Sequence, residues 1–271
     1  MEQLLWLLPL GFMVGAFGTL IGAGGGFILV PVLLLLYPDK SPETITGISL
    51  AVVFFNALSG SFAYSRMKRV DYKSGIIFAV ATIPGSILGA YTTALIPRNL
   101  FNGIFGMLLL AASVFLMLKP EGGGSGEGRR SKHRITRSIT DINGISSTFS
   151  YNPILGAAIS VLVGYVSSLL GIGGGIIHVP VLVHVLDFPV HIATATSHFV
   201  LAVMSLSGTI VHIASGVLST GALQTIALSA GVLFGAQLGA RLSNRLRGIW
   251  IIRSLALALG LAGIRIFIMA F

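Results

Sequence analysis

Hydrophobic and polar positions fall into long blocks along this chain, and most apolar blocks have the length of membrane-spanning helices. Ten apolar segments can be read, five on each side of a polar stretch. They cover about residues 4–21, 27–37, 45–64, 75–95, 100–118, 154–170, 176–186, 192–214, 222–240 and 249–271. Because roughly 20 apolar residues cross a bilayer as a helix, the pattern predicts an all-α polytopic membrane protein.

Composition supports this class, since 54% of the residues are hydrophobic and only 9% are charged. The excess of 17 Lys and Arg over 8 Asp and Glu lies mostly between the apolar segments. It therefore indicates orientation in a lipid bilayer rather than binding to nucleic acid. Cysteine is absent, which excludes disulfides, thiolate metal sites and thiol catalysis.

One phrase occurs twice, in two apolar regions. Gly22-Ala-Gly-Gly-Gly26 is followed by Phe-Ile-Leu-Val-Pro31, and Gly171-Ile-Gly-Gly-Gly175 is followed by Ile-Ile-His-Val-Pro180. Glycine triplets and prolines interrupt helices, and a broken helix in a bilayer is tolerated where it lines a protein-enclosed or watery cavity. Paired breaks in two matching halves point to the binding site of a transporter.

The two halves match beyond the glycine phrase, so the chain contains an internal duplication. Ser49 corresponds to Ser197, and Leu58-Ser59-Gly60 corresponds to Leu206-Ser207-Gly208. We expect two transmembrane repeats, residues 1–118 and 153–271, joined by a flexible basic cytoplasmic linker, residues 119–152.

Basic residues mark three connections and predict the topology. They follow the third segment, lie in the linker, and follow the ninth segment: Arg66, Lys68, Arg69 and Lys73; Arg129, Arg130, Lys132, Arg134 and Arg137; Arg241, Arg245 and Arg247. An odd number of crossings in each half puts all three clusters on one face, which the positive-inside rule makes cytoplasmic. Both termini are then extracytoplasmic, and the repeats have inverted topology.

The short segment 27–37 leaves two alternatives open. As a helix it is only about 16 Å long, against roughly 30 Å of hydrocarbon. It either crosses as part of a tilted, broken helix, or pairs with its predecessor in a re-entrant hairpin. Both alternatives, which apply equally to segment 176–186, keep the number of crossings odd.

Candidate binding groups are the backbone N–H groups of the glycine phrases and a few polar side chains within the apolar segments. A short helix that begins after each phrase would present uncovered N–H groups and a positive dipole end to an anion. His198 is a candidate donor, Gln237 brings an amide into the bilayer, and Arg253 is a candidate counter-charge. The full candidate set is Gly22, Gly24, Gly25, Gly26, Ser49, Gly171, Gly173, Gly174, Gly175, Ser197, His198, Gln237 and Arg253.

Acidic residues are missing from the interior of every apolar segment. A sodium or proton site built on a carboxylate is therefore not expected, and neither a metal site nor a cofactor is predicted. His191 and His198 share a helix face, but no carboxylate stands at ligand spacing. The chain thus favours an anion over a cation.

The doubled glycine phrase, the duplication and the basic middle loop resemble the TauE/SafE family of sulfite exporters and related anion transporters. The resemblance runs from about Leu10 to the C-terminus. It implies an inner-membrane transporter, not an enzyme, whose partners are the lipid bilayer and sulfite or a small organosulfonate. Substrate identity, direction, coupling ion and a homodimeric state stay open.

The expected mechanism is alternating access, in which the anion sits near the midplane between the repeats. Two alternatives belong to other classes. An anion channel would need no alternating states, and an intramembrane serine hydrolase would use Ser49 or Ser197 with a histidine. Adjacent residues such as Ser197 and His198 point about 100° apart on a helix, which disfavours a dyad.

Overall fold

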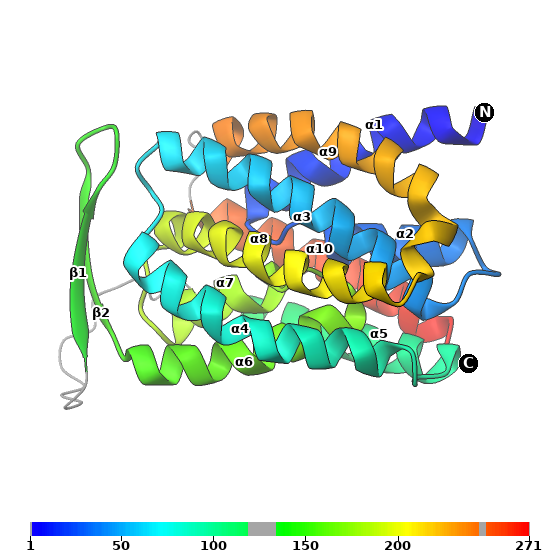
Figure 1. Ribbon diagram of the computed structural model, residues 1–271. Helices are drawn as coiled ribbons and strands as arrows, with labels where there is room; N and C mark the ends of the chain where they lie inside the picture. The colour runs from blue at the N-terminus through cyan, green and yellow to red at the C-terminus, as the bar shows by residue number, and fades with distance from the viewer. Residues whose placement is uncertain (1, 119–133, 244–247, 271) are drawn as a thin grey trace.

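The computed structural model describes residues 2–118, 134–243 and 248–270 (Figure 1). These residues form a bundle of ten α-helices with a two-stranded sheet at one end. The helices are α1 Glu2–Ile21, α2 Gly26–Leu36, α3 Pro42–Arg66, α4 Tyr72–Thr93, α5 Arg98–Leu118, α6 Pro153–Leu170, α7 Gly175–His184, α8 Val190–Ala214, α9 Ala222–Ser243 and α10 Gly248–Ile268. The strands are β1 Ile135–Thr140 and β2 Ser146–Tyr151, and a 3-10 turn, η1, covers Val217–Gly221.

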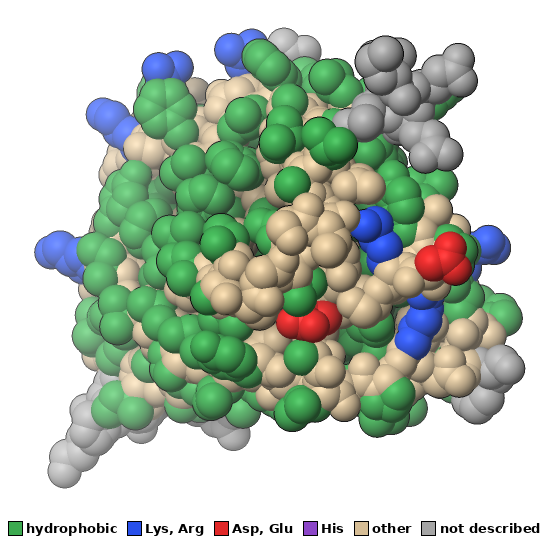
Figure 2. Space-filling view, turned by 45° about the vertical axis from the view of Figure 1, so that its right-hand side comes forward, with side chains coloured by type: hydrophobic (Ala, Val, Ile, Leu, Met, Phe, Trp, Pro, Cys, Tyr) green, Lys and Arg blue, Asp and Glu red, His purple; other side chains and the backbone are tan. Residues whose placement is uncertain are grey.

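The predicted class, an all-α polytopic membrane protein, is confirmed. Six described helical segments are long and apolar enough to cross a bilayer, namely α3, α4, α5, α6, α8 and the segment Val217–Ser243 that contains α9. Hydrophobic side chains cover most of the face seen in Figure 2, with few charged groups among them. Large residues such as Phe234 (73% exposed) and Leu88 (61%) point outward, as lipid contact requires.

Local sequence signals account for several helix starts. The Ser41 hydroxyl accepts a hydrogen bond from Thr44 N at the start of α3, and Asn152 Oδ1 accepts from Ile154 N and Leu155 N at the start of α6. In both helices the cap is followed at once by proline, whose missing N–H and fixed φ suit a first helical position.

The main helix contacts join one half of the sequence to the other. α1 packs on α9, α6 packs on α4, α5 packs on α10, and α3 packs on α8. Glycines allow the backbones to approach closely: a Cβ added at Gly235 in α9 would lie 2.1 Å from Phe12 O in α1. One added at Gly85 in α4 would lie 2.0 Å from Val161 O in α6. The two halves are therefore intertwined rather than packed as separate blocks.

The helix pair α1–α2 turns back on itself. Trp6, Leu7 and Leu10 from the start of α1 line one groove together with Leu36 and Tyr37 from the end of α2. Both ends of the pair therefore lie at the same end of the bundle, where α10 also ends (Figure 1). This is the re-entrant alternative for segment 27–37.

The helix pair α6–α7 turns back in the same way, from the other end of the bundle. A Cβ at Gly156, near the start of α6, would lie 3.1 Å from Leu186 Cδ1, just after α7. Phe188 then packs against Phe149 of the sheet, with ring centroids 4.3 Å apart and the rings tilted by 45°. By contrast, Leu34 O near the end of α2 accepts from Arg98 at the start of α5, at the opposite end of the bundle.

A β-hairpin occupies part of the segment for which we expected a flexible linker. β1 and β2 pair antiparallel, from Ile135 opposite Tyr151 to Thr140 opposite Ser146. Asp141 Oδ1 caps the turn by accepting from Asn143 N and Ile145 N, and Gly144 supplies the positive φ of +79°. The glycine-rich part of the linker with Arg129, Arg130 and Lys132, like Arg245 and Arg247, lies outside the described residues.

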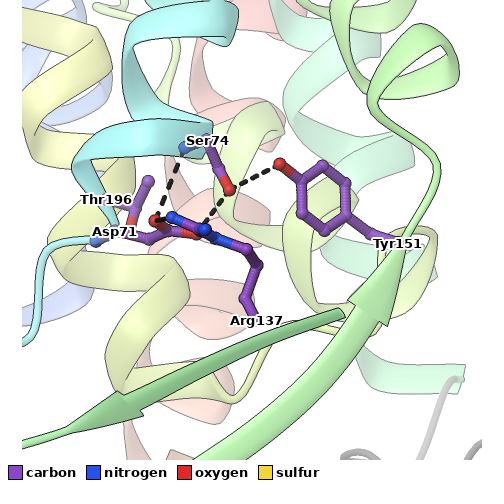
Figure 3. A network of polar contacts seen from close by, with 5 residues as sticks. All are labelled: Asp71, Ser74, Arg137, Tyr151 and Thr196. Carbon is purple, nitrogen blue, oxygen red and sulfur yellow. Dashed lines mark hydrogen bonds and ion pairs between the residues drawn. The ribbon is translucent and has the colours of Figure 1, made fainter. Parts of the chain in front are cut away.

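The hairpin is fixed to the helices by a buried polar network around Asp71, the N-cap of α4 (Figure 3). Arg137 Nη2 of β1 donates to Asp71 Oδ1 at 3.0 Å, and this hydrogen bond raises the pKa of the guanidinium. Tyr151 OH of β2 donates to Ser74 Oγ at 2.5 Å, and Ser74 Oγ donates to Asp71 Oδ2. Thr196 Oγ1 of α8 accepts from Asp71 N. Asp71 thus links the hairpin and α4 through its carboxylate, and α8 through its backbone N–H.

Two further ion pairs extend this attachment to both repeats. Arg69, between α3 and α4, lies 3.3 Å from Asp141 at the hairpin turn, and Arg134 lies 2.7 Å from Asp187 after α7. Although burial acts against it, hydrogen bonds from Ile145 N, Asn143 N and Arg69 hold the pKa of Asp141 below its usual value. The hairpin therefore contacts the first repeat and the second at the same end of the bundle.

We predict that Arg137→Met lowers the free energy of unfolding by about 1–3 kcal/mol, because it leaves the buried Asp71 carboxylate without its charged partner. Thermal unfolding in detergent measures the change. Lys73→Met is the matched control, since Lys73 is an exposed cation at the same end of α4 and should change stability little. Equal effects of the two substitutions would contradict the assigned role of the network.

Candidate functional site

The two glycine phrases form the turns at which the re-entrant pairs reverse. Gly22, Gly24 and Gly25 have φ of +85°, +76° and +81°, and their counterparts Gly171, Gly173 and Gly174 have φ of +70°, +79° and +80°. Residues that carry a side chain rarely adopt these left-handed backbone conformations, so glycine is required at each position. Helices α2 and α7 begin directly afterwards, at Gly26 and Gly175.

The two turns contact each other, backbone against backbone. A Cβ at Gly26 would lie 2.7 Å from Gly171 O and Ile172 O, and a Cβ at Gly175 would lie 2.2 Å from Gly22 O. The contact is reciprocal, so each helix start packs on the turn of the other half. The structure therefore brings together all eight glycines of the predicted site.

Helices α2 and α7 start without a side-chain cap. Their N-cap residues, Gly25 and Gly174, offer no side-chain acceptor to the first N–H groups. The first N–H groups of any α-helix have no partner within the helix and carry its positive dipole end. The interior thus holds two adjacent helix N-termini that are suited to an anion.

Ser49 and Ser197 are equivalent positions in the two halves of the sequence, but their hydroxyls differ. Ser49 Oγ donates to Gly171 O at 2.6 Å, which ties α3 to the turn of the second half. Ser197 is equally buried, and its Oγ has no hydrogen-bond partner among the described residues. The first serine is therefore structural in this conformation, whereas the second has a free donor.

His198 belongs to a polar cluster drawn from three helices. Its Nε2 lies 3.2 Å from Thr19 Oγ1 at the end of α1, and Thr19 Oγ1 donates to Asn56 Oδ1 of α3 at 3.1 Å. The Tyr64 ring meets the histidine edge-on, and its hydroxyl donates to Thr19 O at 2.7 Å. Nothing in the sequence indicates that Thr19, Asn56 and His198 lie together, because each comes from a different helix.

Other buried hydroxyls near the second turn also have no partner among the described residues. Ser167 Oγ would lie 3.0 Å from a Cβ at Gly174, and Ser168 Oγ lies close to Gly208 of α8. Both serines are fully buried at the end of α6. Unpartnered buried hydroxyls are uncommon in proteins, and these two come just before the second turn in the chain.

Two predicted site residues have other partners or surroundings. Gln237 Nε2 donates to Ser59 O and Ser59 Oγ, and so joins α9 to α3. Arg253 is exposed on α10. Neither residue is part of the candidate site. Among the described residues, no group of three or more His, Asp or Glu side chains could hold a metal ion.

Two apolar side chains cover the turns. Val53 of α3 lies against both Gly24 and Gly173, since its Cγ1 is 3.1 Å and 2.5 Å from a Cβ built at each. Leu201 Cδ2, from α8, lies 2.6 Å from the Cβ position of Gly24. Access to the turns from the α3–α8 contact therefore requires these two side chains to move.

The chain resembles known proteins over nearly its whole length. Residues 7–266 match the family model described as Sulfite exporter TauE/SafE. The chain is 36% identical over 263 residues to the Probable membrane transporter protein YunE of Bacillus subtilis, covering 95% of this chain and 94% of the relative. It is 28% identical over 221 residues to the Probable membrane transporter protein MJ0441 of Methanocaldococcus jannaschii, covering 78% and 74%. No solved structure matches the chain.

We predict that Ser49→Ala and Ser197→Ala have unequal effects on stability, although the two serines are equivalent in the repeat. Ser49→Ala should cost about 1–3 kcal/mol, because it leaves the buried carbonyl of Gly171 unpaired. Ser197→Ala should change the free energy of unfolding little, because the Ser197 hydroxyl makes no hydrogen bond to the described residues. Thermal unfolding of both variants without added anion tests this, and equal losses would be the contrary result.

Proposed function

The chain belongs to the sulfite exporter TauE/SafE family of membrane transporters, and on this premise we propose that it carries sulfite or a small organosulfonate by alternating access. The observation that supports this most strongly is the meeting of two uncapped helix N-termini inside the bundle. The anion would bind there, to N–H groups of Gly24–Gly26 and Gly173–Gly175, with Ser197 and His198 beside them.

The distribution of charge favours an anion at this site. Among the described residues, the buried charged side chains are Arg69 and Asp71, and both lie near the hairpin rather than at the glycine turns. An anion at the turns would therefore meet N–H and O–H donors without a nearby carboxylate to repel it. Such donors replace the hydration shell that an oxyanion loses in the membrane interior.

The helix contacts suggest which parts would move. Because α1 and α3 pack on α9, while α6 and α8 pack on α4, each moving unit would combine helices from both halves of the sequence. We propose that these two units rock against each other along the α3–α8 contact, about the glycine turns. Val53 and Leu201 lie on that contact and would act as the gate.

We further propose that the two repeats are inverted in an inner membrane, with the hairpin cytoplasmic and both termini outside. The basic connections predicted from the sequence, such as Arg69 and Arg134, lie at the hairpin end. The chain start and the end of α10 lie at the opposite end (Figure 1). This arrangement obeys the positive-inside rule.

Two alternative functions have less support. An intramembrane hydrolase would need a serine that donates to a histidine, but Ser49 donates to Gly171 O. An anion channel would need an open path, and Val53 and Leu201 lie directly on the turns. Flux that saturates, together with counterflow, would distinguish a carrier from a channel.

We predict that proteoliposomes containing the protein take up sulfite or a short sulfonate with saturable kinetics, and that labelled anion exchanges against unlabelled anion inside. Ser197→Ala should raise KM several-fold, because it removes one donor from the site. Ser205→Ala is the matched control, since the Ser205 hydroxyl donates only to Leu201 O of its own helix. Absence of flux for every sulfur oxyanion tested would refute the proposed function.

A further inference from the structure

The polar cluster beside the first glycine turn differs from its counterpart beside the second, where two of its residues are replaced by apolar ones. His198 lies against Gly60, where a Cβ would be 2.5 Å from the imidazole Cδ2. At the equivalent place in the other half, Leu50 lies against Gly208, with Cδ1 2.9 Å from the Cβ position. The same relation pairs Thr19 with Ser168. The two turns therefore share a backbone plan but differ in the groups around them.

Asn56 differs in polarity from its counterpart in the second half, which is Met204. The Met204 thioether packs on the second turn, with Cε 2.8 Å from a Cβ built at Gly174. By the repeat relation, Asn56 lies beside the first turn, and its contact with Thr19, three residues before Gly22, agrees with this. Asn56 also lies one helical turn beyond Val53, on the same face of α3. Of these two matching positions, the first-half position therefore carries an amide and the second-half position a thioether.

The amide of Asn56 is only half satisfied. Its Oδ1 accepts from the Thr19 hydroxyl, whereas its Nδ2 has no hydrogen-bond partner among the described residues, and the residue is fully buried. A buried N–H donor without an acceptor is costly, more so in a bilayer. The Thr19 contact holds the amide so that the unpaired end is the donor end. Such a group is suited to an acceptor that arrives with the substrate.

We propose that Asn56 recognises the anion through Nδ2, and that the site is consequently one-sided, with a single anion held at the first glycine turn. The ligand class is an oxyanion, whose oxygen atoms accept the two N–H bonds of the amide. The second turn supplies helix N–H groups and free serine hydroxyls but no side-chain amide. This inference rests on the proposed function and adds a specificity-determining residue to it.

Asn56→Leu tests this proposal, because leucine has the same branching and number of side-chain heavy atoms but no polar atoms. In the ligand-free protein, leucine removes an unpaired buried donor but also the acceptor of the Thr19 hydroxyl, which still has His198 Nε2 within reach. The melting temperature without anion should therefore change little. The stabilisation by sulfite, which follows from mass action, should be lost. In proteoliposomes KM for sulfite should rise by about ten-fold or more, as for loss of a hydrogen bond to a charged group.

Met204→Leu is the matched control at the equivalent place, and it should keep both the sulfite-induced shift and the flux. Asn56→Asp is a second variant in case Asn56→Leu does not fold. It keeps an oxygen acceptor for Thr19, replaces the donor by an oxygen, and should also lose the shift. Thr19→Val removes the positioning contact while keeping Nδ2, so its KM should rise less than that of Asn56→Leu.

The outcomes separate the two proposals. If wild-type protein shows neither flux nor a melting shift with sulfite, sulfate, thiosulfate or ethanesulfonate, the proposed function fails. If wild-type protein responds and Asn56→Leu responds equally, only the role of Asn56 is overturned. A lower melting temperature for ligand-free Asn56→Leu with the sulfite shift intact would make Asn56 structural, and would overturn it as well.

Discussion

The reciprocal contact between the two glycine turns is the constraint on which the rest of the structure depends. A helix start can pack this closely on another backbone only where its first residue lacks a side chain, and Gly26 and Gly175 each lie on the turn of the other half. Because positive φ is required three times in each turn, the phrase tolerates few alternatives. The contact also determines where we propose that an anion binds, since it brings two helix N-termini together away from the bundle surface.

The intertwined packing follows from this contact. If α1–α2 enters from one end and α6–α7 from the other, the longer arm of each pair needs a partner along its length. α1 packs on α9 and α6 packs on α4, and glycines at both contacts allow the backbones to approach closely. The hairpin then joins both repeats at one end, through Asp71 and Asp187. Motion of the kind we propose must leave the α1–α9 and α4–α6 pairs intact.

The sequence predicted those features that depend on local pattern and on repetition. The lengths of the apolar segments predicted the helices, and the duplicated glycine phrase predicted the paired helix breaks. α2 and α7 begin at the last glycine of each phrase. The hairpin was missed because its signal, Asn143-Gly144 between β-branched residues, is short and lies in a polar linker. The convergence of Thr19, Asn56 and His198 could not be predicted, because it depends on how three distant helices pack. For the same reason, the sequence could not show that Arg253 is exposed on the surface of the bundle rather than buried near its centre.

The most direct test of a shared anion site at the glycine turns is to locate a bound oxyanion by its scattering. Selenite is chemically close to sulfite, and its selenium gives an anomalous signal in crystals of the protein. We expect one peak per chain between the starts of α2 and α7, within hydrogen-bond distance of Asn56 Nδ2. A peak only at surface cations such as Arg253, or at the basic residues of the hairpin, would contradict it.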